Sequence, residues 1–288
     1  YMCNGAVSHL PDWIILVPIF KDGRHLAWAA MFGHMSDNGG MVPGSIPIRA
    51  ETIYQEGIRI PPTKLYKKGV LQSDVLELIL HNVRTSEWNR FDLNALVAAC
   101  RTASKRCVEI AERFGDDTFY TTMQTMLDRN LEAMRSIINM IVPEEPSYFE
   151  DFICDDGVGK GPYKIACKLW REGDVAIFDF EGTDPQAKSS VNFYLNEDMF
   201  KMFFGSFTIN LFDPHILFND GFYELVEVRI PDGSLLKPKF PAALSGRTHA
   251  LGRIFDVMGG LLGQGAPEAM NAAGFSDSPH LFFSGYDK

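Results

Sequence analysis

The stretch that decides the fold reads Trp13-Ile-Ile-Leu-Val-Pro-Ile-Phe20, an apolar run that predicts a buried strand. Lys21-Asp22-Gly23 follows it as a turn signal, and residues 24–32 supply a second apolar run. A strand, a tight turn and a returning strand are the parts of a β-hairpin. The sequence therefore predicts that the chain begins its ordered structure with this hairpin.

Two His-x-x-Asp motifs lie at the open end of the predicted hairpin, His9-Leu10-Pro11-Asp12 and His34-Met35-Ser36-Asp37. If Phe20 pairs with Arg24 across the turn, Asp12 lies opposite Phe32 and Leu10 lies opposite His34. Directly opposed residues in a ladder are about 5 Å apart. We therefore expect His9, Asp12 and His34 to converge, with Asp37 nearby.

Two imidazoles and one carboxylate make a donor set that suits a divalent transition metal with open coordination positions. Imidazole suits Zn, Fe, Mn or Cu, and the added carboxylate favours Fe or Mn. The alternative interpretation is that these are polar residues that form hydrogen bonds at strand ends. Glu56 follows the long glycine-rich loop of residues 33–48 and is a further candidate acid or base.

The rest of the chain alternates between helical and extended patterns. Helices are predicted, from 3–4 spacing of apolar residues, at about residues 73–83, 93–114, 118–142, 197–212 and 247–263. Strands are predicted at 163–170, 174–181 and 222–230, and the acidic segment 143–161 is expected to be a boundary. Hairpin-like strand pairs with a segregated helical block favour an α+β fold of antiparallel sheets.

We divide the chain into four parts. They are a metal-site hairpin and glycine/proline loop (1–69), a helical block (70–146), a mixed strand and helix region (147–246) and a C-terminal helical segment (247–288). The chain starts at Tyr1 with a strand close behind, so we expect it to be part of a larger subunit.

Single residues and one loop carry weaker expectations. Cys100 and Cys107 lie on one helix face and should be packed thiols. His81 should be a partly buried structural residue, and His25 should be exposed. The glycine-rich run 156–162 lacks the Lys-Ser/Thr ending of a phosphate loop, so a turn is expected. His215, His249 and His280 could line a site only if the fold brings them together.

Composition narrows the class of partners. The chain has 288 residues, of which 46% are hydrophobic, so it can bury a core. The formal net charge of −10 argues against nucleic-acid binding. The longest apolar run is too short for a bilayer, which needs about 20 residues. Five cysteines without a Cys-x-x-Cys pair fit a reduced, cytoplasmic setting.

Several motifs together resemble the hydantoinase B family across nearly all of the chain. They are Gly33-His-Met-Ser-Asp-Asn-Gly-Gly40, Gln55-Glu-Gly-Ile-Arg-Ile-Pro-Pro62, Asp179-Phe-Glu-Gly-Thr-Asp-Pro-Gln186 and Pro231-Asp-Gly-Ser-Leu-Leu236. Within this family, His9-x-x-Asp12 and the stretch 218–286 look most like the large subunit of acetone carboxylases.

This resemblance implies an ATP-dependent, biotin-independent ligase that forms acetoacetate from acetone and bicarbonate. It implies a hetero-oligomer in which a hydantoinase A-like subunit handles ATP, with a small third subunit. It also implies a Mn site, with Fe or Zn as alternatives, held by His9, Asp12 and His34. Asp37 then becomes a supporting residue, and we predict catalytic roles for Asp37 and Glu56.

Two other functions stay open at this stage. A hydrolase of the same family, such as an N-methylhydantoinase or a 5-oxoprolinase, would open a cyclic amide with ATP on the same scaffold. Alternatively, the chain could be a non-catalytic structural subunit. The size of the substrate pocket, and hence the choice of ketone or cyclic amide, cannot be read from the sequence.

Overall fold

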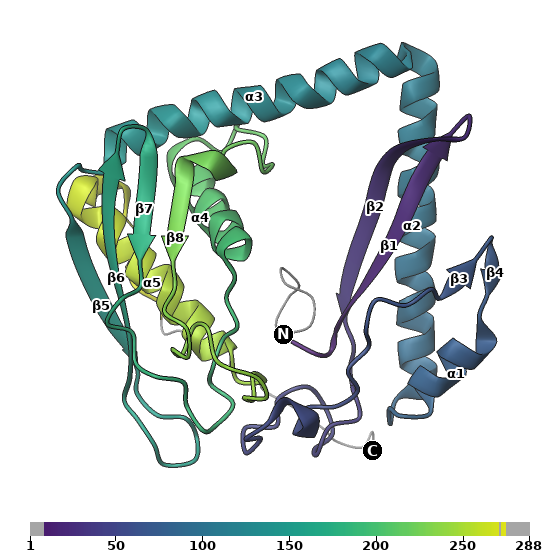
Figure 1. Ribbon diagram of the computed structural model, residues 1–288, viewed down its shortest axis with the longest axis horizontal. Helices are drawn as coiled ribbons and strands as arrows, with labels where there is room; N and C mark the ends of the chain where they lie inside the picture. The colour runs from purple at the N-terminus through teal and green to yellow at the C-terminus, as the bar shows by residue number, and fades with distance from the viewer. Residues whose placement is uncertain (1–8, 271, 275–288) are drawn as a thin grey trace, which may run out of the picture.

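A computed structural model describes residues 9–270 and 272–274. The hairpin and the first two α-helices form one end of the molecule, and a four-stranded sheet with two helices forms the other (Figure 1). The long helix α3 runs from one end to the other. The elements are β1 (Asp12–Lys21), β2 (Arg24–His34), η1 (Ile53–Gln55), β3 (Tyr66–Lys67), β4 (Val70–Leu71), α1 (Ser73–Leu80), α2 (Ser86–Phe114), α3 (Asp116–Ile141), β5 (Ser147–Ile153), β6 (Tyr163–Glu172), β7 (Val175–Asp179), α4 (Glu197–Phe212), η2 (Tyr223–Leu225), β8 (Val226–Arg229), α5 (Thr248–Gly265) and η3 (Pro267–Ala269).

Strands β1 and β2 form the predicted antiparallel hairpin, but the predicted register is wrong. Lys21 pairs with Arg24, so the turn consists of two residues, Asp22 and Gly23, both with positive φ (49° and 77°). A further register shift lies between Ile19 and Phe20. Together they move the ladder by two residues at its open end.

The hairpin is buried on one face only, so the prediction of a fully buried strand at residues 13–20 is wrong. The inward face packs against α2 and includes Trp13, Ile19 and Leu26, all at most 7% exposed. The outward face carries large apolar side chains that are 43–62% exposed, namely Ile14, Leu16, Phe20, Trp28 and Phe32. Alternation explains the division along β1, since successive side chains point to opposite faces. In β2 the register shift leaves Leu26 without a paired residue, so Leu26 lies on the inward face although Trp28, two residues on, lies on the outward face.

The three predicted helices of the helical block are present as α1, α2 and α3. Helix α2 begins earlier than the apolar pattern and ends at Gly115, as predicted. Cys100 is buried and Cys107 partly buried, which confirms the expectation of packed thiols. His81 is exposed, contrary to prediction, because it follows the last turn of α1 and its ring contacts the Glu77 carbonyl there.

The second sheet has the order β5-β6-β7-β8. The pairs β5–β6 and β6–β7 are antiparallel, whereas β8 is parallel to β7 because α4 lies between them in the chain. β5 lies within segment 143–161, where the sequence pattern predicted no strand, and the boundary expected there stays a prediction. β5 is an edge strand with mostly exposed, partly charged side chains, which hides its pattern in the sequence.

The loop between β5 and β6 is a turn, as expected. The Asp156 carboxylate accepts hydrogen bonds from the backbone N–H groups of Val158 and Lys160. The α+β class is confirmed: the strands form the hairpin, the short antiparallel pair β3–β4 and the four-stranded second sheet, and of these strand pairs only β7–β8 is parallel.

Hydrophobic cores do not follow the predicted divisions of the chain. The core under the hairpin also contains residues of α1 and α2, so the first two predicted parts pack together. The last turns of α3, including Met134 and Ile138, belong to the core of the second sheet. The divisions themselves stay predictions. Within the described residues, no helix combines the length and the apolar character needed to cross a bilayer.

Candidate metal centre

Strand pairing brings three predicted ligands together at the open end of the hairpin. Asp12 begins β1 and lies directly opposite His34, which ends β2. A turn closed by the Asp12 N–H donating to the His9 carbonyl (3.1 Å) folds His9 back over this end. Atoms that can bind a metal, one from each of these three residues, lie within 4.8 Å of one another.

The three side chains form a compact, partly buried cluster. His34 Nδ1 lies 2.8 Å from Asp12 Oδ1, and the rings of His9 and His34 stack with centroids 5.2 Å apart. His9 is 5% exposed and the Asp12 side chain 6%, whereas the His34 side chain is 47% exposed. Solvent therefore reaches the cluster from the His34 side.

Arg247, the residue directly before α5, also contacts the cluster. Its Nη2 lies 3.1 Å from Asp12 Oδ2, the oxygen that His34 does not contact. Burial would raise the pKa of Asp12, but the hydrogen bond with His34 and the nearby charges, including Arg247, outweigh it and lower that pKa. Asp12 is therefore a carboxylate with a partner on each oxygen.

His9 is held as a neutral imidazole. Burial, with the Arg247 charge adding to it, lowers the pKa of His9 to about 3. Its Nδ1 is buried and has no hydrogen-bond partner among the described residues. A buried nitrogen without a partner costs free energy unless something binds it. Because neutral imidazole is the form that binds a metal, this nitrogen fits a metal ligand.

The donor set as a whole fits a divalent transition metal. The set consists of the buried, neutral imidazole of His9, the exposed imidazole of His34 and the ionised carboxylate of Asp12. Imidazole and carboxylate groups are typical ligands of Zn, Fe and Mn, and three protein ligands leave coordination positions for water or substrate. Among the described residues, these three form the one group of histidine, cysteine and acidic side chains close enough to hold an ion.

Asp37, the fourth member of the two motifs, has a different position. It is 1% exposed, and its carboxylate accepts hydrogen bonds from the Gly39 and Gly44 N–H groups and from the Arg84 backbone and side chain. Burial would raise the pKa of Asp37, but the bonds from Arg84 outweigh it and lower that pKa. Asp37 therefore braces the glycine-rich loop, and its catalytic role stays a prediction.

Glu56 lies beyond the glycine-rich loop, directly after η1, and is 4% exposed. Its Oε1 accepts the backbone N–H groups of Leu244 and Ser245, and its Oε2 is buried without a described hydrogen-bond partner. Burial raises the pKa of Glu56 to about 7 against the effect of those two bonds. Glu56 thus joins the loop to the segment that carries Arg247.

Sequence reasoning did not predict the role of Arg247. A lone arginine that lies 235 positions from Asp12 shows no spacing signal, although Leu244-Ser-Gly-Arg-Thr-His249 belongs to the stretch that resembles acetone carboxylases. His215 is exposed and His249 half-buried, and neither joins the cluster. His280 lies outside the described residues.

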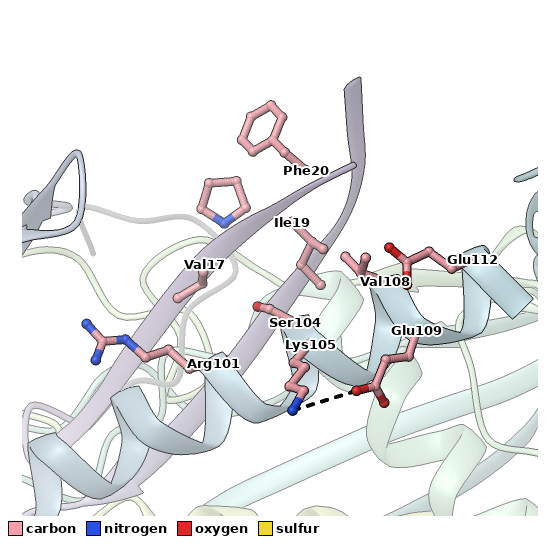
Figure 2. A pocket seen from close by; sticks show the side chains of 10 residues that line it. Val17, Ile19, Phe20, Arg101, Ser104, Lys105, Val108, Glu109 and Glu112 are labelled. Carbon is pink, nitrogen blue, oxygen red and sulfur yellow. Dashed lines mark ion pairs between the residues drawn. The ribbon is translucent and has the colours of Figure 1, made fainter. Parts of the chain in front are cut away.

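A surface pocket of about 530 Å³ lies elsewhere, between β1 and α2. It is lined by Val17 to Phe20 near the hairpin turn, and Figure 2 shows Lys105 and Glu109 of α2 as an ion pair beside it. The three clustered ligands lie at the opposite end of the hairpin. This pocket is therefore not the substrate site of the candidate metal centre.

The fold and the cluster define the class: an α+β chain in which a candidate set of metal ligands is assembled at the end of a hairpin. The sequence model of the hydantoinase B/oxoprolinase family matches residues 1–288 of this chain. The chain belongs to this family.

Two curated relatives are similar to this chain over most of its length. Caprolactamase subunit beta of Pseudomonas jessenii is 30% identical over 271 residues, which make up 92% of this chain and 45% of the relative. 5-Oxoprolinase 1 of Arabidopsis thaliana is 30% identical over 284 residues, covering 89% of this chain and 22% of the relative. The chain thus spans less than half the length of either relative.

Two solved structures share the fold. The crystal structure of the ATP-dependent caprolactamase from Pseudomonas jessenii matches with a TM-score of 0.82 at 28% identity, over 91% of this chain and 45% of that one. A nucleotide-free structure of acetone carboxylase matches with a TM-score of 0.78 at 19% identity, over 92% of this chain and 37% of that one. The second likeness concerns the fold alone.

Proposed function

We propose that this chain supplies the metal-binding part of an ATP-dependent enzyme that hydrolyses a cyclic amide. The observation that carries the proposal is the convergence of His9, Asp12 and His34 within 4.8 Å. Two relatives at 30% identity, a caprolactamase subunit and a 5-oxoprolinase, are named for the opening of cyclic amides. We expect Mn²⁺, with Fe or Zn as alternatives.

The residues of this chain would contribute in three ways. His9, Asp12 and His34 would hold the ion, and the exposed side chain of His34 marks the side from which substrate arrives. A bound divalent ion polarises a carbonyl oxygen or lowers the pKa of a bound water. Arg247 keeps the Asp12 carboxylate ionised and oriented. ATP would be handled by a hydantoinase A-like partner in a hetero-oligomer.

Carboxylation of a small ketone with bicarbonate is the second candidate. The observation that favours it is the shared fold with acetone carboxylase, together with a His-Asp-His donor set like the one that the sequence resemblance assigns to Mn. A small third subunit would then be expected. The acetone carboxylase reaction, which the sequence alone favoured, therefore stays a prediction.

Metal analysis of single variants tests the site. In the intact protein, purified with any partner subunits, His9→Ala and His34→Ala should each lose most of the bound Mn, Fe or Zn measured by inductively coupled plasma mass spectrometry. His81→Ala is the matched control, because His81 is exposed and lies far from the cluster along the chain. Unchanged metal content in both site variants would overturn the proposal.

Two assays separate the reactions. ATP-dependent ring opening of caprolactam or 5-oxoproline, without incorporation of radiolabelled bicarbonate, supports the hydrolase. Bicarbonate incorporation into acetone or acetophenone supports the carboxylase instead. If the complex keeps full activity when His9, Asp12 and His34 are all replaced, the chain is a non-catalytic structural subunit.

A further inference from the structure

Asp12 and Arg247 form an ion pair that is almost completely hidden from solvent. Their side chains are 6% and 12% exposed, and the Nη2–Oδ2 distance is 3.1 Å. The second carboxylate oxygen, Oδ1, points to His34. A buried carboxylate without a countercharge is strongly destabilising, so the arginine supplies the charge that neutralises Asp12 in the metal-free protein.

Arg247 is held in place from two directions. The preceding residues Leu244 and Ser245 donate their N–H groups to the buried Glu56 carboxylate. The Gly246 N–H donates to the Ser190 carbonyl at 2.9 Å, and the Arg247 N–H donates to the Leu244 carbonyl at 3.1 Å. The guanidinium therefore projects from a segment just before α5 whose backbone is braced by hydrogen bonds within the protein.

We propose that Arg247 is a positioning residue that serves as the resident countercharge of Asp12 and keeps the ligand cluster folded while the metal is absent. This inference rests on the proposed metal site. When an ion binds, it takes over part of the neutralisation of Asp12, and the nearby arginine charge opposes the ion. Arg247 thus stabilises the metal-free state more than the metal-bound state.

Thermal unfolding of the intact protein after chelation tests this role. Arg247→Met should lower the apparent Tm of the metal-free protein by roughly 5–10 °C, because it leaves a buried charge unpaired. Adding Mn²⁺ alone should then raise the Tm of this variant by more than it raises that of the wild type. Arg247→Lys keeps the charge, so its metal-free Tm should lie between those of the wild type and Arg247→Met. This variant replaces Arg247→Met in the test if Arg247→Met does not fold.

Arg253→Met is the matched control. Arg253 lies on α5, is 14% exposed and pairs with Asp151 at 2.6 Å, so its loss also removes a shielded ion pair. The metal-free Tm of Arg253→Met should fall, but Mn²⁺ should raise the Tm of this variant by no more than it raises the Tm of the wild type. A second control is the double variant Asp12→Asn, Arg247→Met, which removes both charges and should regain most of the metal-free Tm.

The outcomes separate the two proposals. If wild-type protein binds no metal, the proposed metal site fails, yet the chelated single and double variants still report on Arg247. If the wild type binds Mn²⁺ but Arg247→Met keeps the metal-free Tm of the wild type, the role of Arg247 is overturned. Equal Mn²⁺ increments in Arg247→Met and Arg253→Met would overturn it as well.

Discussion

Glu56 is a single residue on which burial and hydrogen bonding act in opposite directions. Two backbone N–H groups favour its ionised form, but it is 4% exposed and its Oε2 has no described partner. Burial prevails and raises its pKa to about 7. The folded protein therefore binds a proton at Glu56 that the unfolded chain, with an ordinary glutamate pKa, releases at lower pH.

The contribution of Glu56 to stability should fall as pH rises through this window, whereas buried His9, whose pKa is lowered to about 3, contributes stability that rises with pH until the histidine of the unfolded chain is neutral. Between the ordinary glutamate pKa of 4.5 and the folded pKa of about 7, the folded state holds more protons at Glu56 than the unfolded state. The linkage relation then removes up to about 3 kcal/mol of stability by pH 8. Urea unfolding of the wild type and of a Glu56 variant from pH 5 to pH 8 measures it, because the His9 contribution cancels in the difference.

Glu56→Gln isolates this contribution, because the amide oxygen can still accept the two N–H groups while carrying no charge. The variant should match the wild type at pH 5 and exceed it at pH 8. Glu181→Gln, on an exposed side chain, is the control and should follow the wild-type curve. Parallel curves for Glu56→Gln and the wild type would contradict the assignment.

At the scale of elements, the glycine-rich loop is fixed by close backbone approaches. Gly39 pairs with Gly57 in an isolated bridge, and Asp37 and Glu56 anchor the two sides of the loop. A Cβ on Gly39 would lie 1.9 Å from the Asn82 carbonyl oxygen. The loop can therefore lie this close to the backbone of Asn82, just after α1, only with glycine at position 39.

Replacing Gly39 should be far costlier than replacing Gly44. Both have positive φ, 74° and 90°, but a Cβ on Gly44 meets nothing within 4 Å. Gly44→Ala should cost about 1 kcal/mol from backbone strain alone. Gly39→Ala adds a clash with backbone and should cost more than about 3 kcal/mol. Denaturant unfolding compares them, and equal losses would rule out the close approach as the cause.

At the scale of the whole molecule, the candidate centre lies where the hairpin end of the molecule contacts the part that contains the second sheet. The three candidate ligands lie at the open end of the hairpin or in the turn before it, whereas Arg247 precedes α5, whose buried residues belong to the core of the second sheet. The loop also connects the two parts directly, since Thr52 bridges to Ala242 and the Ile53 N–H donates to the Pro241 carbonyl. Binding at the centre should therefore be felt in both parts.

Amide hydrogen exchange tests this coupling. Mn²⁺ should slow exchange in the hairpin, residues 12–34, and also in residues 244–251 around Arg247, because a ligand stabilises the segments that must stay folded to bind it. Strand β6 in the core of the second sheet is the internal control and should change little. Protection confined to the hairpin would show that the Arg247 segment is not coupled to the centre.

The sequence by itself determined what local patterns encode. Apolar spacing of 3–4 residues placed the helices, and the two His-x-x-Asp motifs at the open end of the hairpin predicted which side chains would meet. β5 escaped notice because Glu150 and Asp151 interrupt its apolar residues, so this edge strand shows no apolar alternation. The register was wrong by two residues because it depends on the two-residue turn and on an irregularity within β1.

Only the tertiary structure decided which residues surround the three ligands. It separated Asp37, which braces a loop, from the cluster, and it brought Arg247 to Asp12 across 235 positions of sequence. It also buried Glu56 against Leu244 and Ser245 and thereby shifted its pKa. The physical reason is that burial and charge pairing arise between segments distant in the chain, whereas helices, strands and turns follow from neighbours.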